Sequence, residues 1–403
     1  MLVVPETPPE SVWKMVPDGA KLRKLLAISE SKPVQIRRSF ISHEGKACQV
    51  LLSPTPAKAT QFARLTQARA LVSKFMEDRP SAVTVMLAGL EADTAMIMAE
   101  AIASAFYAAA AMMPNRKTKP DPAPSLTQID FVGLPGKLDT RRIKAEANGN
   151  HLARWLTALP PNEINPTGYR RHLEKLSSEN GWDFKFIGEK ELARKGAGAF
   201  LAVCQASAER DAGIAHIRYR PGKKTARAGL SLVGKGICFD TGGSQLKPFK
   251  SMLNMHEDMG GSAVAVGLLQ TLTEMGYPEP VDCWLAISEN RLGPNGYIPQ
   301  DIITAANGTT IQAIHTDAEG RLVLADTLHL ASQTKPRAII DFATLTGSCV
   351  AALTERYSGV FTNREHLHPA LITAGKDSGE RVWPFPMDED FDQSELPNIN
   401  NIG

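Results

Sequence analysis

The chain has few cysteines and almost no net charge. Its 403 residues include five cysteines, an odd number, and they are widely spaced with no CxxC pair. This pattern argues against a disulfide framework and against a thiolate zinc site. The formal net charge of +2 gives no electrostatic reason to expect a nucleic-acid or membrane partner.

Neither the pattern of a secretion signal nor a long apolar run is expected from these residues. The N-terminus of the chain, MLVVPETPPESVWK, has prolines and glutamates where a signal peptide needs a basic start and an apolar stretch. The most apolar region, residues 95–113, is interrupted by Glu100 and is rich in alanine. Such a segment is typical of a packed helix and not of a membrane span. These absences predict a cytoplasmic protein.

A chain of this length is longer than one hydrophobic core usually supports, so two domains are expected. In the second half, apolar strand patterns alternate with amphipathic helix patterns, which predicts a mixed, mainly parallel sheet flanked by helices. Ligand sites in such α/β folds collect at the carboxyl ends of strands. The expected parts are a smaller N-terminal α/β domain at residues 1–139, a linker helix at 140–159 and the larger α/β domain at 160–403.

Two segments of the larger domain concentrate charged residues among glycines. If the fold brought their four carboxylates together, these groups would repel and take up protons unless a multivalent cation neutralised them. A metal site is therefore the central prediction. The charged residues are Lys235, Asp240, Lys247 and Asp258 in residues 233–261, and Asp317, Glu319 and Arg321 in residues 315–322.

Each of these residues also has a simpler interpretation. GLSLVGK, residues 229–235, matches the start of a phosphate-binding loop, but Gly236 stands where Ser or Thr would bind magnesium. Asp240 could be a turn residue and Asp258 a charge at a helix N-terminus. Asp317 and Glu319 could form a helix cap. These interpretations suit the residues singly, but together they leave seven charged groups beside strand ends without a purpose.

Neighbouring histidines, serine and cysteine are weaker candidates for chemistry. His256 and His315 lie beside the acidic residues but form no HExxH pair, so we expect them to orient ligands or to pack. Ser348 lacks the nucleophile-elbow pattern, and Cys349 has no local activator in the sequence. Covalent catalysis is therefore disfavoured.

Five motifs carry a resemblance to a known family. They are VGKGICFDTGG, the LKP of residues 246–248, MHEDMGG, HTDAEGRLVLAD and IDFATLTG. In order and spacing they resemble the successive signatures of the leucyl aminopeptidase (cytosol aminopeptidase) family. The resemblance runs from about residue 141 to residue 403, and the N-terminal third is similar only in size and α/β character.

The resemblance implies a catalytic domain with a dinuclear metal site at residues 160–403. It implies two divalent ions per subunit, manganese or zinc, with magnesium or cobalt as alternatives, and bicarbonate at Arg321. Asp240 and Glu319 would bridge both ions, and a lysine can be a ligand only as the neutral amine. The implied metal ligands are Lys235, Asp240, Asp258, Asp317 and Glu319, the catalytic residues are Lys247 and Arg321, and the substrate-binding residues are Met255, Thr344, Leu345 and Gly347.

The implied activity is removal of leucine-like N-terminal residues from peptides by a two-metal-activated water. The family resemblance also implies a homohexamer. Family members continue beyond the position of Gly403, so the catalytic domain is expected to be cut short at its C-terminus. Because some members of the family bind DNA, a DNA-binding or regulatory protein with weak or no peptidase activity is the alternative.

Overall fold

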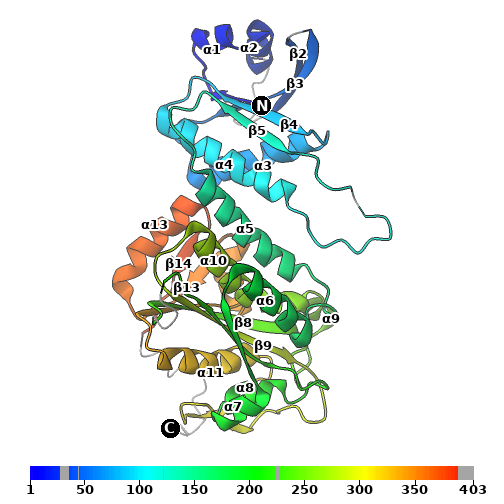
Figure 1. Ribbon diagram of the computed structural model, residues 1–403, viewed down its shortest axis with the longest axis vertical. Helices are drawn as coiled ribbons and strands as arrows, with labels where there is room; N and C mark the ends of the chain where they lie inside the picture. The colour runs from blue at the N-terminus through cyan, green and yellow to red at the C-terminus, as the bar shows by residue number, and fades with distance from the viewer. Residues whose placement is uncertain (28–35, 44, 121, 223–226, 389–403) are drawn as a thin grey trace. The chain divides into compact units, whose positions relative to one another are not determined.

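The computed structural model describes residues 1–27, 36–43, 45–120, 122–222 and 227–388. They form two compact units, which Figure 1 colours along the chain. The first contains Met1–Met112, Arg116–Lys144 and the segment that begins at Ser348, and the second contains Met113–Asn115 and Ala145–Gly347. Each unit is built on a five-stranded sheet with helices, which confirms the predicted α/β class.

The sheet of the first unit is mixed and has the order β2-β3-β1-β4-β5. β1 is parallel to both of its neighbours, β4 is parallel to β5, and β2 is antiparallel to β3. The expected strand at residues 34–40 begins outside the described residues. The strands are β1 (Leu2–Pro5), β2 (Arg37–His43), β3 (Lys46–Thr55), β4 (Ala82–Leu87) and β5 (Gln128–Val132).

Helices cover both faces of this sheet because its apolar side chains alternate between the faces. Val3 and Leu51 contribute to the cluster with α3 (Gln61–Met76) and α4 (Ala92–Ala110). Leu2 and Leu52 contribute to the cluster with α1 (Glu10–Met15) and α2 (Gly19–Ala27). α4 is the apolar segment of residues 95–113, and among the described helices none combines the length and hydropathy that crossing a bilayer needs.

The segment after Ser348 adds short elements to the first unit. β13 and β14 form a parallel pair, and Arg381, just before β14, lies 4.0 Å from the centre of the Phe62 ring in α3. The elements are α12 (Gly347–Leu353), η2 (Thr354–Arg356), β13 (Ser358–Val360), η3 (Glu365–Leu367), α13 (His368–Ser378) and β14 (Val382–Pro384).

The sheet of the second unit has the order β12-β8-β9-β7-β6. β12, β8 and β9 are parallel, whereas β9, β7 and β6 pair antiparallel. A separate antiparallel pair, β10 and β11, follows β9 along the chain. The strands are β6 (Asp183–Gly188), β7 (Gly213–Tyr219), β8 (Leu230–Asp240), β9 (Val281–Asn290), β10 (Ile302–Thr304), β11 (Thr310–Gln312) and β12 (Ala338–Phe342).

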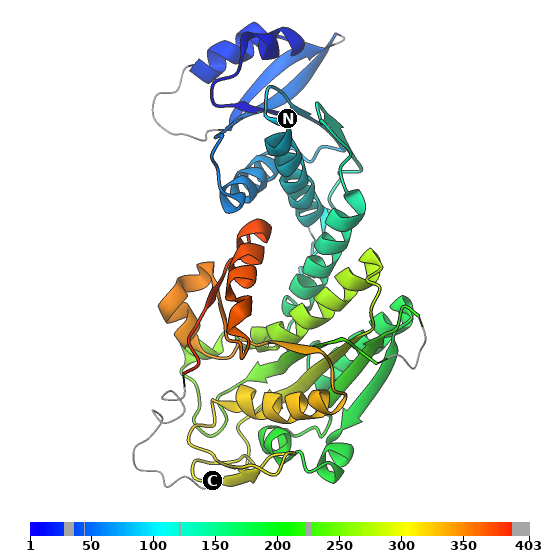
Figure 2. The ribbon, with the colours of Figure 1, turned by 90° about the vertical axis from the view of Figure 1, so that its left-hand side faces the viewer.

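Two helical layers enclose this sheet, and Figure 2 shows α10 on one face and α11 on the other. Val233 and Trp284 pack into the cluster with α8 and α11, while Leu232 and Leu285 pack into the cluster with α6 and α10. The helices are α5 (Thr140–Thr157), α6 (Pro166–Asn180), α7 (Glu189–Arg194), α8 (Gly198–Cys204), α9 (Phe249–Met252), η1 (Met255–Met259), α10 (Gly260–Met275) and α11 (Glu319–Gln333).

β8 is longer than the sequence pattern predicts. The apolar run predicts a strand that ends at Val233, but the strand continues to Asp240. Gly234 permits this because a Cβ there would lie 2.4 Å from Cα of Ser262, so only glycine lets the first turn of α10 approach the strand. The extension carries two of the predicted ligands to the end of the sheet.

Candidate metal centre

The carboxyl end of β8 is the base of the candidate centre. Lys235 lies within the strand and Asp240 is its last residue. Asp258 comes from η1, which leads directly into α10, and Glu319 begins α11. Parallel strands end at one edge of a sheet, so residues that are far apart in the sequence meet there.

Lys235 connects two of the predicted ligands. Its Nζ lies 2.9 and 2.8 Å from Oδ1 and Oδ2 of Asp258, and 2.9 Å from Oε1 of Glu319. The side chain is only 3% exposed, and it lies against Gly320, where a Cβ would come within 2.7 Å of its Cε. The glycine therefore leaves the space that the lysine occupies.

A second group of carboxylates lies beside it. One oxygen from each of Asp240, Asp317 and Glu319 lies within 4.8 Å of the others. Nζ of Lys247 is 2.9 Å from Oδ2 of Asp240 and also contacts Oδ1 of Asp317. Lys247 comes from the loop after β8, in which Gly242 and Gly243 have positive φ angles of 88° and 67°. That backbone suits glycine and turns the chain back over the end of the strand.

An asparagine that the sequence analysis did not single out holds this group together. Nδ2 of Asn290, at the end of β9, donates to Oδ1 of Asp240 at 2.8 Å and to the Thr316 carbonyl at 3.0 Å, and lies 3.4 Å from Oε2 of Glu319. The Tyr297 hydroxyl donates to the same carbonyl. Asn290 is 1% exposed, so its amide fixes the positions of two carboxylates.

The electrostatics of the cluster favour cations. Four carboxylates face two lysines. Asp317 and Lys247 are half-buried, and the other four residues are buried. Burial raises the pKa of Asp258 to about 6, against the effect of Lys235. Burial also raises the pKa of Glu319, with Asp240 and Asp258 adding to the effect and Lys235 opposing it. Asp258 and Glu319 thus bind protons more strongly than usual, because burial disfavours their charged forms and Lys235 only partly offsets it.

The donor set fits divalent ions. Clustered carboxylate oxygens are the ligands of hard cations, and the excess of carboxylates over lysines leaves charge for an ion to neutralise. Burial lowers the pKa of Lys235, but Glu319 and Asp258 outweigh burial and raise it. Without an ion, Lys235 is therefore an ammonium group. As a metal ligand it must be the neutral amine, so ion binding there would displace a proton.

Comparisons with known proteins agree with this geometry. The family profile described as "Cytosol aminopeptidase family, catalytic domain" matches residues 151–403. The "Probable cytosol aminopeptidase" of Synechococcus sp. (strain CC9311) is 35% identical over 367 residues, which cover 88% of this chain and 72% of that protein. The chain belongs to the cytosol aminopeptidase family. Its class is therefore that of the metalloaminopeptidases, which are hydrolases.

Two further comparisons describe the extent of the cytosol aminopeptidase likeness. The "Probable cytosol aminopeptidase" of Stutzerimonas stutzeri is 41% identical over 267 residues, and the match spans 65% of this chain and about half, 53%, of that protein. A solved structure of a tomato leucine aminopeptidase mutant is 26% identical, with a TM-score of 0.84 over 99% of this chain and 81% of that one. These matches favour the peptidase over the DNA-binding alternative.

Among the positions that the aminopeptidase resemblance assigns to substrate, Thr344 contacts the cluster. The Thr344 hydroxyl donates to Oδ1 of Asp258 at 2.6 Å, and the Thr344 carbonyl accepts from Nζ of Lys235 at 3.0 Å. Leu345 is 44% exposed, Gly347 begins α12, and Met255 begins η1. Thr344 thus joins the segment after β12 to two predicted ligands.

The remaining predicted residues flank the cluster. Arg321 is exposed in the first turn of α11, two residues after Glu319. Nδ1 of His315 accepts from the backbone N–H of Asp317 at 3.2 Å, and His256 is half-buried in η1. The phosphate-loop interpretation of residues 229–235 is wrong, because residues 230–240 form one buried strand.

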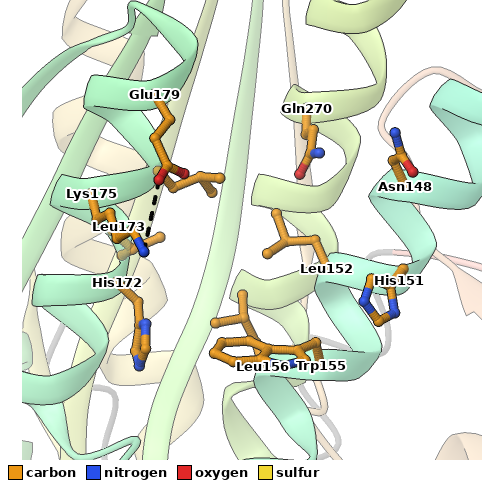
Figure 3. A pocket seen from close by; sticks show the side chains of 11 residues that line it. Asn148, His151, Leu152, Trp155, Leu156, His172, Leu173, Lys175, Glu179 and Gln270 are labelled. Carbon is orange, nitrogen blue, oxygen red and sulfur yellow. Dashed lines mark ion pairs between the residues drawn. The ribbon is translucent and has the colours of Figure 1, made fainter. Parts of the chain in front are cut away.

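A separate cavity of about 320 Å³ lies between α5, α6 and α10. Figure 3 shows His151, Leu152 and Trp155 of α5 on one side of it and His172 and Leu173 of α6 on the other. Its charged residues, Lys175 and Glu179, are 75% and 58% exposed and lie 3.8 Å apart on one helix, as solvated surface pairs do. None of the predicted ligand, catalytic or substrate-binding residues lines it, so it is not the metal centre.

Proposed function

We propose that this chain is a two-metal aminopeptidase that removes leucine-like residues from the N-termini of peptides. One observation carries the proposal. Asp240, Asp317 and Glu319 converge to within 4.8 Å, and Lys235 joins Glu319 to Asp258 beside them. An excess of buried negative charge is costly, and a pair of divalent ions would neutralise it.

The five predicted ligands would hold two ions. Lys235 and Asp258 lie on one side of Asp240 and Glu319 and would hold one ion, and Asp317 would help to hold the other. Manganese or zinc suits this set, with magnesium and cobalt as alternatives. When bound, such a pair lowers the pKa of a water molecule and polarises a carbonyl group.

The side chains of this chain would supply the rest. Asp258 would accept a hydrogen bond from the free α-amino group of the peptide. Because only the first residue carries that group, cleavage would be restricted to the first peptide bond. Lys247 would donate to the carbonyl oxygen as negative charge develops there. Arg321, at the N-terminus of α11, would bind a small anion such as bicarbonate, because the guanidinium group and the helix terminus attract the same charge. Met255, Thr344, Leu345 and Gly347 would line the side-chain pocket.

Hydrolysis of a chromogenic leucine anilide tests this proposal. We expect turnover with Mn²⁺, none after chelation by EDTA, and recovery when Mn²⁺ or Zn²⁺ is returned. Asp258→Asn should lose turnover, whereas its exposed neighbour Glu257 provides the matched control Glu257→Gln, which should keep it. Failure of the unmodified chain to turn over under any of the four divalent metals would refute the proposal.

The substrate and assembly assignments have their own tests. A panel of aminoacyl anilides should show the highest kcat/KM for leucine and similar apolar residues. We also propose the homohexameric assembly and cytoplasmic location implied by the resemblance and by the relatives' names. Light scattering of the purified protein would decide the first, and fractionation of the source cells the second.

A further inference from the structure

Lys247 occupies a place between two of the predicted ligands of one ion. Its Nζ contacts Oδ2 of Asp240 and Oδ1 of Asp317, two of the three carboxylates in the tight cluster. The side chain is 14% exposed. Burial lowers its pKa, but the hydrogen bonds to Asp317 and Asp240 outweigh burial and raise it. The ammonium group thus holds together the carboxylates that an ion would need.

The two lysines divide the four carboxylates between them. Lys235 contacts Asp258 and Glu319, and Lys247 contacts Asp240 and Asp317. They differ in how the backbone holds them. Lys235 is inside β8 and pairs with Ala286 of β9, whereas Lys247 is in the loop after two glycines with positive φ, where its N–H donates to the Thr241 carbonyl at 2.9 Å. Lys247 is thus held by a loop outside the sheet, and Lys235 by a buried strand.

We infer that Lys247 is a tethered cation that substitutes for one metal ion in the metal-free protein and competes with that ion for Asp240 and Asp317. The inference rests on the two-metal centre proposed above. Each contact is a charge-assisted hydrogen bond, and an ion that takes either carboxylate must first displace it. Lys247 therefore weakens the affinity mainly for the ion on the Asp317 side, because that ion needs both of the carboxylates that Lys247 contacts.

The displacement has a second consequence. While Lys247 pairs with the two carboxylates, its ammonium group is not available to a substrate carbonyl. On ion binding, Lys247 would lose its contacts with Asp240 and Asp317, and its ammonium group would become free to donate to a substrate carbonyl. Binding of the ion on the Asp317 side and release of Lys247 are thus coupled. Without that ion, Lys247 stays paired with Asp240 and Asp317.

Stepwise Mn²⁺ binding tests the competition without any measurement of catalysis. Metal-free wild type, Lys247→Met and Lys247→Gln would be titrated with Mn²⁺ by calorimetry, and free Mn²⁺ would be counted by electron paramagnetic resonance. We expect one of the two binding steps to tighten about tenfold or more in both variants, with the other changed by less than about threefold. Lys250→Met removes the same charge from an exposed position three residues away and should leave both steps as in wild type.

Three titration results would overturn the inference. They are unchanged affinity in the Lys247 variants, weaker affinity in them, and an equal gain in Lys250→Met. The last would indicate a general effect of charge and no direct competition. The titration stays informative if the peptidase activity fails, because it measures only ions bound.

Labelling of the unmodified protein avoids any variant that might not fold. Acetic anhydride would be applied briefly to metal-free and Zn²⁺-loaded protein, and the lysines would be compared by mass spectrometry. We expect labelling of Lys247 to rise severalfold on Zn²⁺ loading, because a lysine released from two carboxylates is deprotonated more easily and only the neutral amine reacts with the anhydride, with the exposed Lys250 constant as the internal reference. Equal or lower labelling of Lys247 in the loaded protein would overturn the inference.

Discussion

The two ends of β9 carry buried charge that is treated in opposite ways. At its amino end, Asp282 is met by Arg220 at 2.6 Å and lies 3.5 Å from His216. Burial raises the pKa of Asp282, but its contacts with His216 and Arg220 outweigh burial and lower it. At the carboxyl end, beside Asn290, the pKa values of Asp258 and Glu319 are raised.

The difference separates structural charge from functional charge within one sheet. Arg220 also donates to the carbonyls of Tyr219 and Val281, so the amino-end cluster is satisfied by the protein itself. The carboxyl-end cluster has four carboxylates and two lysines, so its negative charge is not balanced by the side chains within it. Buried ionisable groups therefore point to a binding site when their own neighbours leave the charge unbalanced.

The largest expected effect comes from removing the charge partner of Asp282 at the amino end of β9. Arg220→Met leaves the buried Asp282 without its guanidinium partner, so the free energy of unfolding should fall by about 3 kcal/mol. Urea unfolding with Mn²⁺ and with EDTA would measure it, and the loss should be the same in both. Arg218→Met, which removes a half-exposed pair with Asp183 at 3.8 Å, should cost less than about 1 kcal/mol. If Mn²⁺ restored the free energy of unfolding that Arg220→Met loses, the amino end of β9 would also respond to metal, and the two ends would not differ as described.

An intermediate effect is expected from adding a side-chain carbon next to Lys235 in the carboxyl-end cluster. Gly320→Ala places a Cβ within 2.7 Å of Cε and 2.8 Å of Nζ of Lys235. The lysine must move, and we expect Mn²⁺ affinity and kcat/KM to fall about 10- to 100-fold, as when the support of a metal ligand is lost. Gly188→Ala, whose Cβ would have its nearest neighbour at 4.0 Å, is the matched control. Unchanged Mn²⁺ binding in a folded Gly320→Ala protein would argue against Lys235 as a ligand.

The smallest effect concerns the pH dependence of the satisfied end. His216 stacks on Trp284 at 3.6 Å, and burial lowers its pKa although Asp282 opposes this. Below pH about 6.5 the unfolded chain takes up a proton that folded His216 refuses, so stability falls as the pH falls. His216→Phe should reduce this slope between pH 7 and 5 by less than about 1.4 kcal/mol per pH unit, measured by urea unfolding. His366→Phe, at an exposed position, is the control, and an unaltered slope in His216→Phe would contradict the assignment.

The sequence predicted the fold class well where the signal was local. Strand and helix patterns follow from the spacing of apolar residues. Phe62, Leu65, Ala68, Val72 and Phe75 are spaced for one helix face, which predicts a helix at residues 61–76, and α3 spans these residues. β8 was predicted too short because Gly234, Lys235 and Gly236 do not resemble a strand. Their presence in one depends on contacts with α10, which no local pattern contains. β1, at the centre of the first unit's sheet, was missed for a similar reason, because four residues give too little periodicity.

The candidate centre was predictable only in its charged part. Carboxylates in glycine-rich segments are conspicuous, and the structure places the charged residues of β8, its loop, η1 and α11 at one sheet edge. Asn290 was missed because a single asparagine at a strand end forms no motif that distinguishes it from other asparagines. Pairing would have revealed it, since Asn290 is the partner of Asp240 in the parallel register of β8 and β9. Register depends on which strands are neighbours, and the sequence does not state that.

Thr344 has a consequence for anyone who redesigns this protein for other peptides. Its hydroxyl and its carbonyl bind Asp258 and Lys235, and the proposed function also assigns it to the side-chain pocket. Replacing it to admit a new side chain would therefore disturb Asp258 and Lys235 at the same time. Leu345 and Met255 make neither of these hydrogen bonds, so we expect substitutions there to alter substrate preference while Asp258 and Lys235 stay in place.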